Sequence, residues 1–277
     1  MIVQKTLKLP DINVLLKKML EVTLSFDGNE HKIKKWLNIH RKTIRNNKKL
    51  VVCRSKKNDI KILLPILSNL LVRATRGERG NRVFEELQKK LKSKKDLNKK
   101  NYKHILKSAK YRWGVKIGTQ IISDVVDFFG NKLKWNWSEY FKEAEKHHKT
   151  NFQQDDLLKI KNISFKVRDL ALSWFSHDYV ANDLHVIRVM TRIGLLNYGF
   201  DLLSDSSLEM GNNPGNEKQY LFLHRLVHKL SRLTKKPHYS PSDLDRIFWS
   251  YGKSICGNNP KCKICPIKKL CLTGQNK

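Results

Sequence analysis

The chain has 277 residues, 40% of them hydrophobic, which is enough for one large domain or two ordinary domains with a real core. Its 56 lysines and arginines outnumber its 25 aspartates and glutamates, so the formal net charge is +31. Such an excess repels itself unless a polyanion is bound, which makes nucleic acid the first candidate partner. A genome biased toward lysine, asparagine and isoleucine is the alternative explanation, and the charge alone does not separate DNA from RNA.

The apolar stretches and the cysteines argue against a membrane or secreted protein. No apolar segment of a signal peptide follows Met1. The longest apolar stretch, residues 63–72, is too short to cross a bilayer. Clustered cysteines are typical of a reducing compartment. We therefore expect a protein that contacts no membrane and lies in the cytoplasm, at the nucleoid or, in a eukaryote, in the nucleus. We also expect it to be a monomer.

Residues 1–60 mix short apolar stretches with basic runs and predict short elements of an N-terminal extension. We expect this extension to pack with the C-terminal domain. Cys53 is predicted to be a small core residue. No β-hairpin or alternating set of strands is predicted anywhere in the chain.

Residues 61–88 predict a helix that is interrupted at residues 73–80. Its leucines recur at helical spacing and form one apolar stripe: Leu63, Leu64, Leu67, Leu70 and Leu71. The lysine-rich stretch 89–103 is predicted to be a solvated face or loop. A second helix is predicted over residues 120–129, and its inward residues are Ile121, Ile122, Val125, Val126 and Phe129.

The second half of the chain is also predicted to be helical. Ser240-Pro-Ser-Asp243 has an N-cap serine, a proline in the first turn and an acidic residue three positions on, so it starts a helix. The other segments expected are a helix–turn–helix over 155–175, a helix over 186–196, a loop over 206–219 and a helix over 220–233. The predicted class is therefore all-α.

Four of the five cysteines form one short run, Cys256-x5-Cys262-x2-Cys265-x5-Cys271. Four thiolates this close can enclose one metal centre. Zinc sites of four thiolates usually contain two separate CxxC pairs, whereas this run has one pair flanked by single cysteines. The spacing favours a [4Fe–4S] cluster. Zinc, a disulfide pair and unliganded thiols stay open as alternatives.

Four lysines are interleaved with these cysteines: Lys261, Lys263, Lys268 and Lys269. Because a loop held by a metal centre would present these lysines on one surface, we expect them to contact DNA phosphates.

Two internal segments and the cysteine run together resemble the endonuclease III branch of the helix-hairpin-helix DNA glycosylases. The segments are Ile160-Lys-Asn-Ile-Ser-Phe-Lys166-Val-Arg-Asp-Leu-Ala-Leu and Ala181-Asn-Asp183-Leu-His185-Val-Ile-Arg-Val. The resemblance covers roughly residues 63–271. It implies a two-domain fold, in which residues 61–178 form a helical barrel domain with the hairpin. Residues 179–277 would supply the C-terminal helices and the [4Fe–4S] cluster loop.

The resemblance also implies a catalytic pair. In that family the hairpin lysine is the nucleophile, and an aspartate at the start of a following helix is the second catalytic group. These positions are Lys166 and Asp183 here, 17 residues apart. Asp183-Leu-His185 matches the family's Asp-Thr-His with one substitution, and His185 would be structural. Arg168 or the helix end would favour the neutral amine that attack requires.

The hairpin departs from the family, because Lys161-Asn162-Ile163-Ser164 contains neither the usual proline nor the usual glycines. Asn162 tolerates a left-handed conformation and Ser164 is small, so both remain expected contacts to a DNA phosphate. Arg73-Ala-Thr-Arg76 lies where the family has a glutamine that fills the space of the extruded base. Arg73 and Arg76 would reach the orphaned partner base or a phosphate.

These residues suit the excision of a damaged base from double-stranded DNA. The base must leave the stack, and a carboxylate stabilises the cation-like transition state at C1′. A lysine that attacks C1′ forms a Schiff base, which permits β-elimination and hence AP lyase activity. An oxidised base such as 8-oxoguanine is the expected substrate. The alternatives are a monofunctional glycosylase for another lesion or mismatch, and a non-catalytic, structure-specific DNA-binding protein of the same fold.

Overall fold

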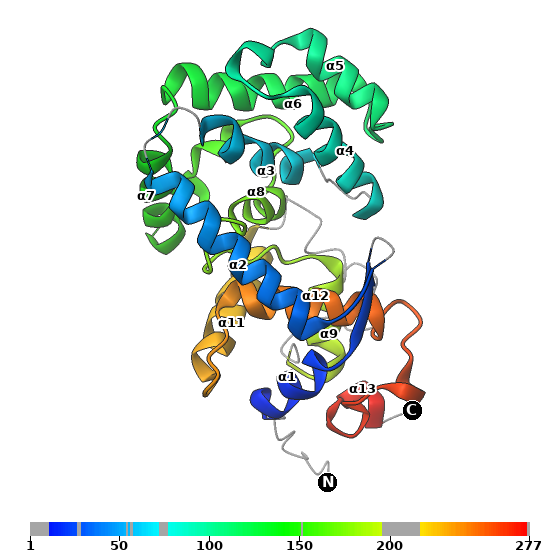
Figure 1. Cartoon of the computed structure of the whole chain (residues 1–277). Coiled ribbons are helices and arrows are strands. Elements are labelled where there is room, and N and C mark those ends of the chain that lie inside the picture. The colour runs from blue at the N-terminus through cyan, green and yellow to red at the C-terminus, as the bar shows by residue number, and fades with distance from the viewer. Residues whose placement is uncertain are drawn as a thin grey trace. The chain divides into compact units, whose positions relative to one another are not determined.

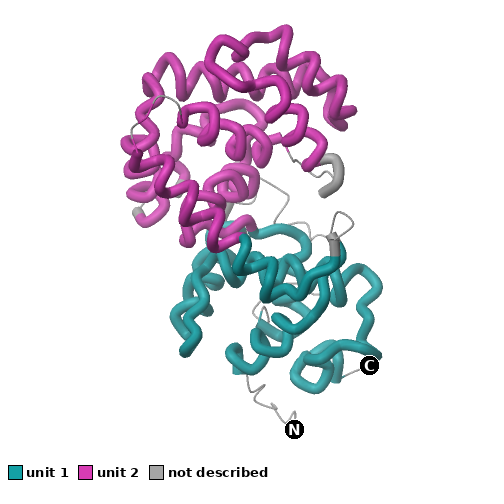
Figure 2. Tube along the Cα trace, in the orientation of Figure 1, with its two compact units in different colours: residues 1–39, 182–277 teal, residues 40–181 magenta. Residues whose placement is uncertain are grey.

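The structure is a computed structural model that describes residues 11–26, 29–53, 55, 58–71, 77–150, 152–195 and 217–275. The described chain is mostly helical, as Figure 1 shows, which confirms the predicted all-α class. It divides into two compact units, coloured separately in Figure 2. Unit 1 comprises residues 1–39 and 182–277, and unit 2 comprises residues 40–181.

Unit 1 contains a β-hairpin, so the prediction that the chain has none was wrong. β1 (Thr23–Phe26) pairs antiparallel with β2 (Asn29–Lys32), with Leu24 opposite His31. Val22 and Leu24 are buried, whereas Thr23 and Ser25 are exposed, so the alternation of a half-buried strand is present. It spans too few residues to stand out in the sequence. The dipeptide Asp27-Gly28 between the strands was the overlooked signal.

The hairpin leads into α2 (Ile33–Val52), whose residues up to Ile39 belong to unit 1. Five further helices are described in this unit. They are α1 (Ile12–Leu20), α9 (Leu184–Ile193), α11 (Glu217–Leu233), α12 (Pro241–Ser254) and α13 (Leu272–Gln275), with short 3₁₀ turns η6 (Cys262–Ile264) and η7 (Lys268–Leu270). The predicted cap of α12 is confirmed, since the Ser240 hydroxyl accepts from the Asp243 N–H and the Asp243 carboxylate accepts from the Ser240 N–H.

Helix α12 packs directly on α9. A side chain at Gly252 would place its Cβ 2.9 Å from the backbone oxygen of His185, so the glycine permits a close approach of the two helices. The predicted apolar face of α12 is buried: Leu244, Ile247, Phe248 and Tyr251. The start of α9 is therefore held against the last turn of α12.

Unit 2 is a cluster of helices around one apolar core. Its elements are α2 (Ile33–Val52, from His40 onward), α3 (Asp59–Leu71), α4 (Gly77–Lys90), η2 (Lys94–Asp96), α5 (Lys99–Ser108), α6 (Val115–Asp127), the π-helical turn η3 (Phe128–Lys132), α7 (Trp137–Thr150), η4 (Phe152–Gln154), η5 (Asp156–Lys159) and α8 (Phe165–Leu172). The predicted leucine stripe of α3 is buried in this core, as are Ile121, Ile122, Val125 and Phe129.

The division between the units differs from the predicted boundary at residue 60. It falls between Ile39 and His40, inside α2, so residues 40–60 belong to unit 2 rather than to the domain with the cysteines. Contacts within unit 2 explain this. Asn47 Nδ2 donates to the backbone oxygen of Trp174 at 2.9 Å, and Leu50 packs against the core. The second boundary follows Ala181, three positions after residue 178.

An ion triad lies buried in unit 2. Arg168 on α8 pairs with Asp169 Oδ1 at 2.6 Å and with Asp155 Oδ2 at 3.3 Å, and none of the three side chains is more than 1% exposed. The Tyr140 hydroxyl donates to Asp155 at 3.3 Å. Burial, followed by the nearby Asp155 charge, raises the pKa of Tyr140 well above its usual value.

We expect Arg168→Met to destabilise the protein by roughly 3–5 kcal/mol, because two carboxylates would stay buried without their cation. Urea unfolding followed by far-UV circular dichroism measures this change. Lys159→Gln is the control, since it removes an exposed lysine paired with Asp156 and should change the midpoint little. A midpoint for Arg168→Met equal to that of the control would contradict the assignment.

Candidate functional site

Asp183 begins α9 as its N-cap residue. Its Oδ1 accepts hydrogen bonds from the backbone N–H groups of His185, at 2.9 Å, and Val186, at 3.1 Å. These bonds satisfy two of the unpaired N–H groups of the first helical turn and fix the carboxylate. The side chain stays half-buried. A carboxylate held in this way is oriented in advance for chemistry at its other oxygen.

Two buried arginines lie near Asp183 in unit 1, Arg188 on α9 and Arg246 on α12. Burial lowers the pKa of both guanidinium groups, and the nearby Asp183 carboxylate acts in the opposite direction on each. Neither arginine was predicted from the sequence to belong to the site. The signal in the sequence is that each arginine stands in a helix close to apolar residues that face the core.

Lys166 lies in the first turn of α8 in unit 2 and is half-buried. The hairpin before it is preserved as a turn between η5 and α8. Asn162 has φ of +73°, a left-handed conformation that asparagine tolerates better than most residues, and Ser164 occupies the N-cap position of α8. Asn162 and Ser164 are each half-buried. The predicted turn thus forms without glycine.

Arg168 does not have the role expected of it. It was expected to provide a positive charge that favours a neutral Lys166, but its charge is compensated by Asp155 and Asp169. Desolvation explains the difference, since an arginine buried in a core requires carboxylate partners. The predicted DNA contacts Arg73 and Arg76 lie outside the described residues. Lys166 and Asp183 belong to different units.

The four clustered cysteines line one pocket in unit 1: Cys256, Cys262, Cys265 and Cys271. Cys256 and Cys271 are buried, and the other two are half-buried. Tyr251 and Ile267 are among the other residues around this pocket. The Tyr251 hydroxyl lies 2.9 Å from the Cys265 sulfur. The spacing in the sequence therefore does bring the four thiols to one place.

Arg192, in the last turn of α9, holds the first part of the cysteine loop. Its guanidinium donates to the backbone oxygens of Cys256, Gly257 and Asn258, at 3.3, 2.5 and 3.1 Å, and lies 3.6 Å from the Cys256 sulfur. The Cys271 thiol donates to the Arg192 backbone oxygen at 3.1 Å. This role of Arg192 was not predicted from the sequence, because its partners are 64 to 66 positions away.

Within the described part of the chain, the cysteines are not among the side chains that meet closely enough to hold a metal ion. The thiols thus surround the pocket without forming a ready coordination set. Burial raises the pKa of the Cys256 and Cys271 thiols, and for Cys256 the hydrogen bond from Arg192 acts in the opposite direction. A cation would have to replace these protons, since metals bind thiolates.

The predicted phosphate contacts lie on the same loop as the cysteines, and one of them, Lys261, lines the pocket. Lys261, Lys263 and Lys269 are exposed, and Lys268 is half-buried on η7. Gly274 allows the end of the loop to close, because a Cβ there would lie 2.5 Å from the backbone oxygen of Lys268. The exposed lysines and the cysteine pocket therefore belong to one folded loop.

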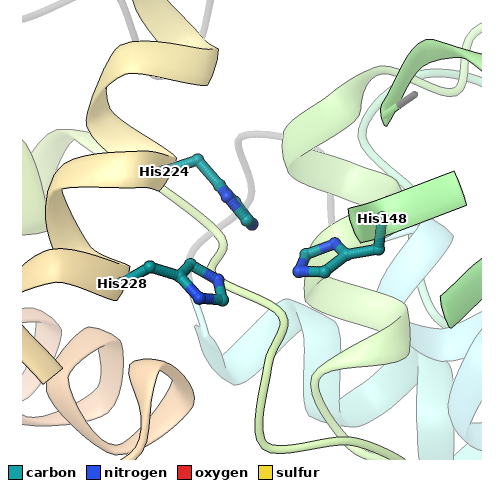
Figure 3. A group of neighbouring side chains, drawn as sticks. All are labelled: His148, His224 and His228. Atoms are coloured by element: carbon teal, nitrogen blue, oxygen red, sulfur yellow. The ribbon is translucent and has the colours of Figure 1, made fainter. Parts of the chain in front are cut away.

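Histidines of α11 were assigned no role from the sequence. Figure 3 shows His224 and His228 projecting from successive turns of this helix, with ring centroids 4.6 Å apart. His148, which the same figure draws, belongs to α7 of unit 2, where its ring lies 4.5 Å from that of Tyr179. Within unit 1 the His224–His228 contact is a packing of two rings, and within unit 2 so is the His148–Tyr179 contact.

Comparison of the chain with protein-family models, with curated proteins and with solved structures found no match in any of the three. Among the described helices, none combines the length and the apolar character needed to span a bilayer.

Proposed function

We propose that the protein is a helix-hairpin-helix DNA glycosylase with AP lyase activity and a [4Fe–4S] cluster. The observation that supports this most directly is the arrangement of α9. One end of this helix orients the Asp183 carboxylate, and the other end holds the four-cysteine loop through Arg192. The net charge of +31 suits a duplex DNA partner.

In this proposal Asp183 stabilises positive charge that develops at C1′ of the damaged nucleotide. Lys166, as a neutral amine, attacks C1′ from the first turn of α8, the bond from C1′ to the base breaks, and the base leaves with the bonding electrons. The lysine nitrogen loses a proton and the C1′–O4′ bond then opens, with O4′ taking up a proton, which gives the Schiff base. The Schiff base permits loss of a C2′ proton and β-elimination of the 3′ phosphate. Asn162 and Ser164 supply the turn that contacts a phosphate, and an oxidised base such as 8-oxoguanine is the proposed substrate.

Cys256, Cys262, Cys265 and Cys271 would hold the cluster. Four thiols around one pocket suit either an iron–sulfur cluster or zinc. The cluster is proposed because the sequence has one CxxC pair flanked by single cysteines rather than two CxxC pairs. The Arg192 guanidinium offsets the negative charge that four thiolates would bring. A cluster bound there would cross-link the loop and keep its lysines on one rigid surface.

Borohydride trapping tests the proposed activity. Duplexes with 8-oxoguanine, thymine glycol, uracil or an abasic site are incubated with the protein and sodium borohydride, which reduces a Schiff base to a stable adduct. We expect an adduct on an oxidised base and on the abasic site. Lys166→Gln should abolish the adduct with nearly unchanged duplex binding. Lys161→Gln, which removes an exposed lysine of the same hairpin, is the matched control.

Each other result selects an alternative. An adduct that survives in Lys166→Gln would refute the nucleophile. Release of free base without an adduct would indicate that water attacks and that the enzyme is monofunctional. Tight duplex binding with neither product would indicate a non-catalytic DNA-binding protein.

A further inference from the structure

Unit 2 contains a cavity of about 890 Å³ that plays no part in the proposed excision chemistry. This volume lies in the range of small-molecule sites, roughly 300–1,000 Å³. The end of α2, the start of α3, η2, η3 and the start of α7 surround it, so five elements converge there. Its wall combines apolar residues, among them Leu50, Val51 and Leu133, with two tryptophans and three lysines.

The segment that forms one wall has an unusual backbone. Lys134 and Trp135 are consecutive left-handed residues, with φ of +47° and +62°. Such conformations cost of order 1–3 kcal/mol each for residues other than glycine, and they concentrate at ligand sites. The Trp135 N–H donates to the Phe129 backbone oxygen at 2.7 Å, which anchors the segment to the π-helical turn. The wall is thus held in a fixed, strained shape.

Both carboxylates of the cavity have partners. Asp59, only 4% exposed, accepts from the Trp137 indole N–H at 2.8 Å and pairs with Lys94 at 2.5 Å. Glu139 accepts from the Asn136 side chain at 2.5 Å. The Lys94 ammonium also lies 4.7 Å from the centroid of the Trp135 ring. Trp135, Trp137 and Lys94 are therefore positioned before any ligand arrives.

Two lysines in the wall could bind an anion. Lys132 and Lys134 are exposed, and within the described residues neither forms a salt bridge. The cavity thus offers an apolar, aromatic wall next to two ammonium groups. A ligand that fits both has a flat apolar part and a phosphate.

We propose that this cavity binds a nucleotide. The base would pack against Trp135 and the apolar wall, and the phosphate would contact Lys132 and Lys134. Basic side chains interleaved with aromatic residues are the usual means of holding unpaired nucleotides. The ligand is either a free mononucleotide or an unpaired nucleotide of a strand, which share this chemistry. The inference does not depend on the glycosylase activity, because none of these residues is in the proposed catalytic set.

Cys53 makes the proposal directly measurable. It lines the cavity and is exposed, which also corrects the expectation that it is a core residue. Cys53 directly follows the end of α2, where Val52 is also exposed. A bound nucleotide should therefore protect the Cys53 thiol from alkylation by a maleimide. The Cys53→Ser variant measures how much alkylation occurs at the other cysteines, and this amount is subtracted.

The experiment titrates the full chain with thymidine monophosphate and with a 5′-phosphorylated oligothymidylate, and follows tryptophan fluorescence and Cys53 alkylation. We expect saturable quenching and protection. Lys132→Gln combined with Lys134→Asn should weaken binding at least about tenfold, because two charged contacts are lost. Asparagine keeps the left-handed conformation at 134. Lys103→Gln with Lys107→Gln, an equal loss of charge on exposed positions of α5, should leave binding unchanged.

Protection by the mononucleotide would identify a free nucleotide as a sufficient ligand, and protection by the oligonucleotide alone would identify a strand. Absence of saturable quenching and of protection with both probes would overturn the proposal. Equal weakening in the α5 control would also overturn it, since only general charge would then be acting. If inorganic phosphate competes as strongly as thymidine monophosphate, the base contributes nothing to binding. The site would then be a general anion site, and the proposal that it binds a nucleotide would be wrong.

Discussion

Asp183→Asn is expected to slow base excision by roughly 10²–10³-fold while leaving the fold intact. Asparagine keeps an oxygen that can accept from the N–H groups of His185 and Val186, so the cap of α9 is retained. It lacks the negative charge that would stabilise the cation-like transition state. Single-turnover excision on the lesion identified by trapping gives the rate, and thermal unfolding gives the stability.

Asp183→Ala separates the two roles of this side chain. Alanine removes both the charge and the cap, so we expect the same loss of rate and a further loss of about 0.5–2 kcal/mol in stability. A normal excision rate for Asp183→Asn would exclude Asp183 as a catalytic group. It would then act only as the cap that the structure shows.

Cys262→Ser is expected to remove the visible absorbance and most of the bound iron, and to lower solubility. Cys262 is only half-buried, so the loss of its sulfur removes little apolar contact by itself. A large effect would therefore report on a metal that cross-links the loop, since metal binding energy contributes to folding. Absorbance spectra and elemental analysis of protein purified without oxygen provide the measurement.

Cys53→Ser is the matched control, because Cys53 is an exposed cysteine in the other unit. It should keep the iron content and colour of the unsubstituted protein. A colourless protein with one equivalent of zinc would favour the zinc alternative. Full stability of Cys262→Ser after loss of its iron would show that the cluster has no structural role.

Features that depend on neighbours along the chain could be predicted from the sequence. The stripe of α3 follows from leucines at helical spacing, and the cap of α12 follows from Ser240 and Asp243 three positions apart. The cysteines that line one pocket all lie within 16 residues, so a short loop is enough to gather them. Asn162 takes the left-handed turn that its short polar side chain allows.

Features that depend on distant partners were decided by the tertiary structure. The buried carboxylates Asp155 and Asp169 take up the charge of Arg168, and Arg192 reaches carbonyls more than 60 positions away. Residues 40–60 join unit 2 because α2 packs on its core, and the cavity exists only where five elements meet. Helical periods and caps are local free-energy minima of the chain, whereas ion pairing and cavity shape follow from how those elements pack. The sequence by itself thus determined the helical class, the helix stripes and the clustering of the thiols, and packing decided which charges are buried and which lysines remain for an anion.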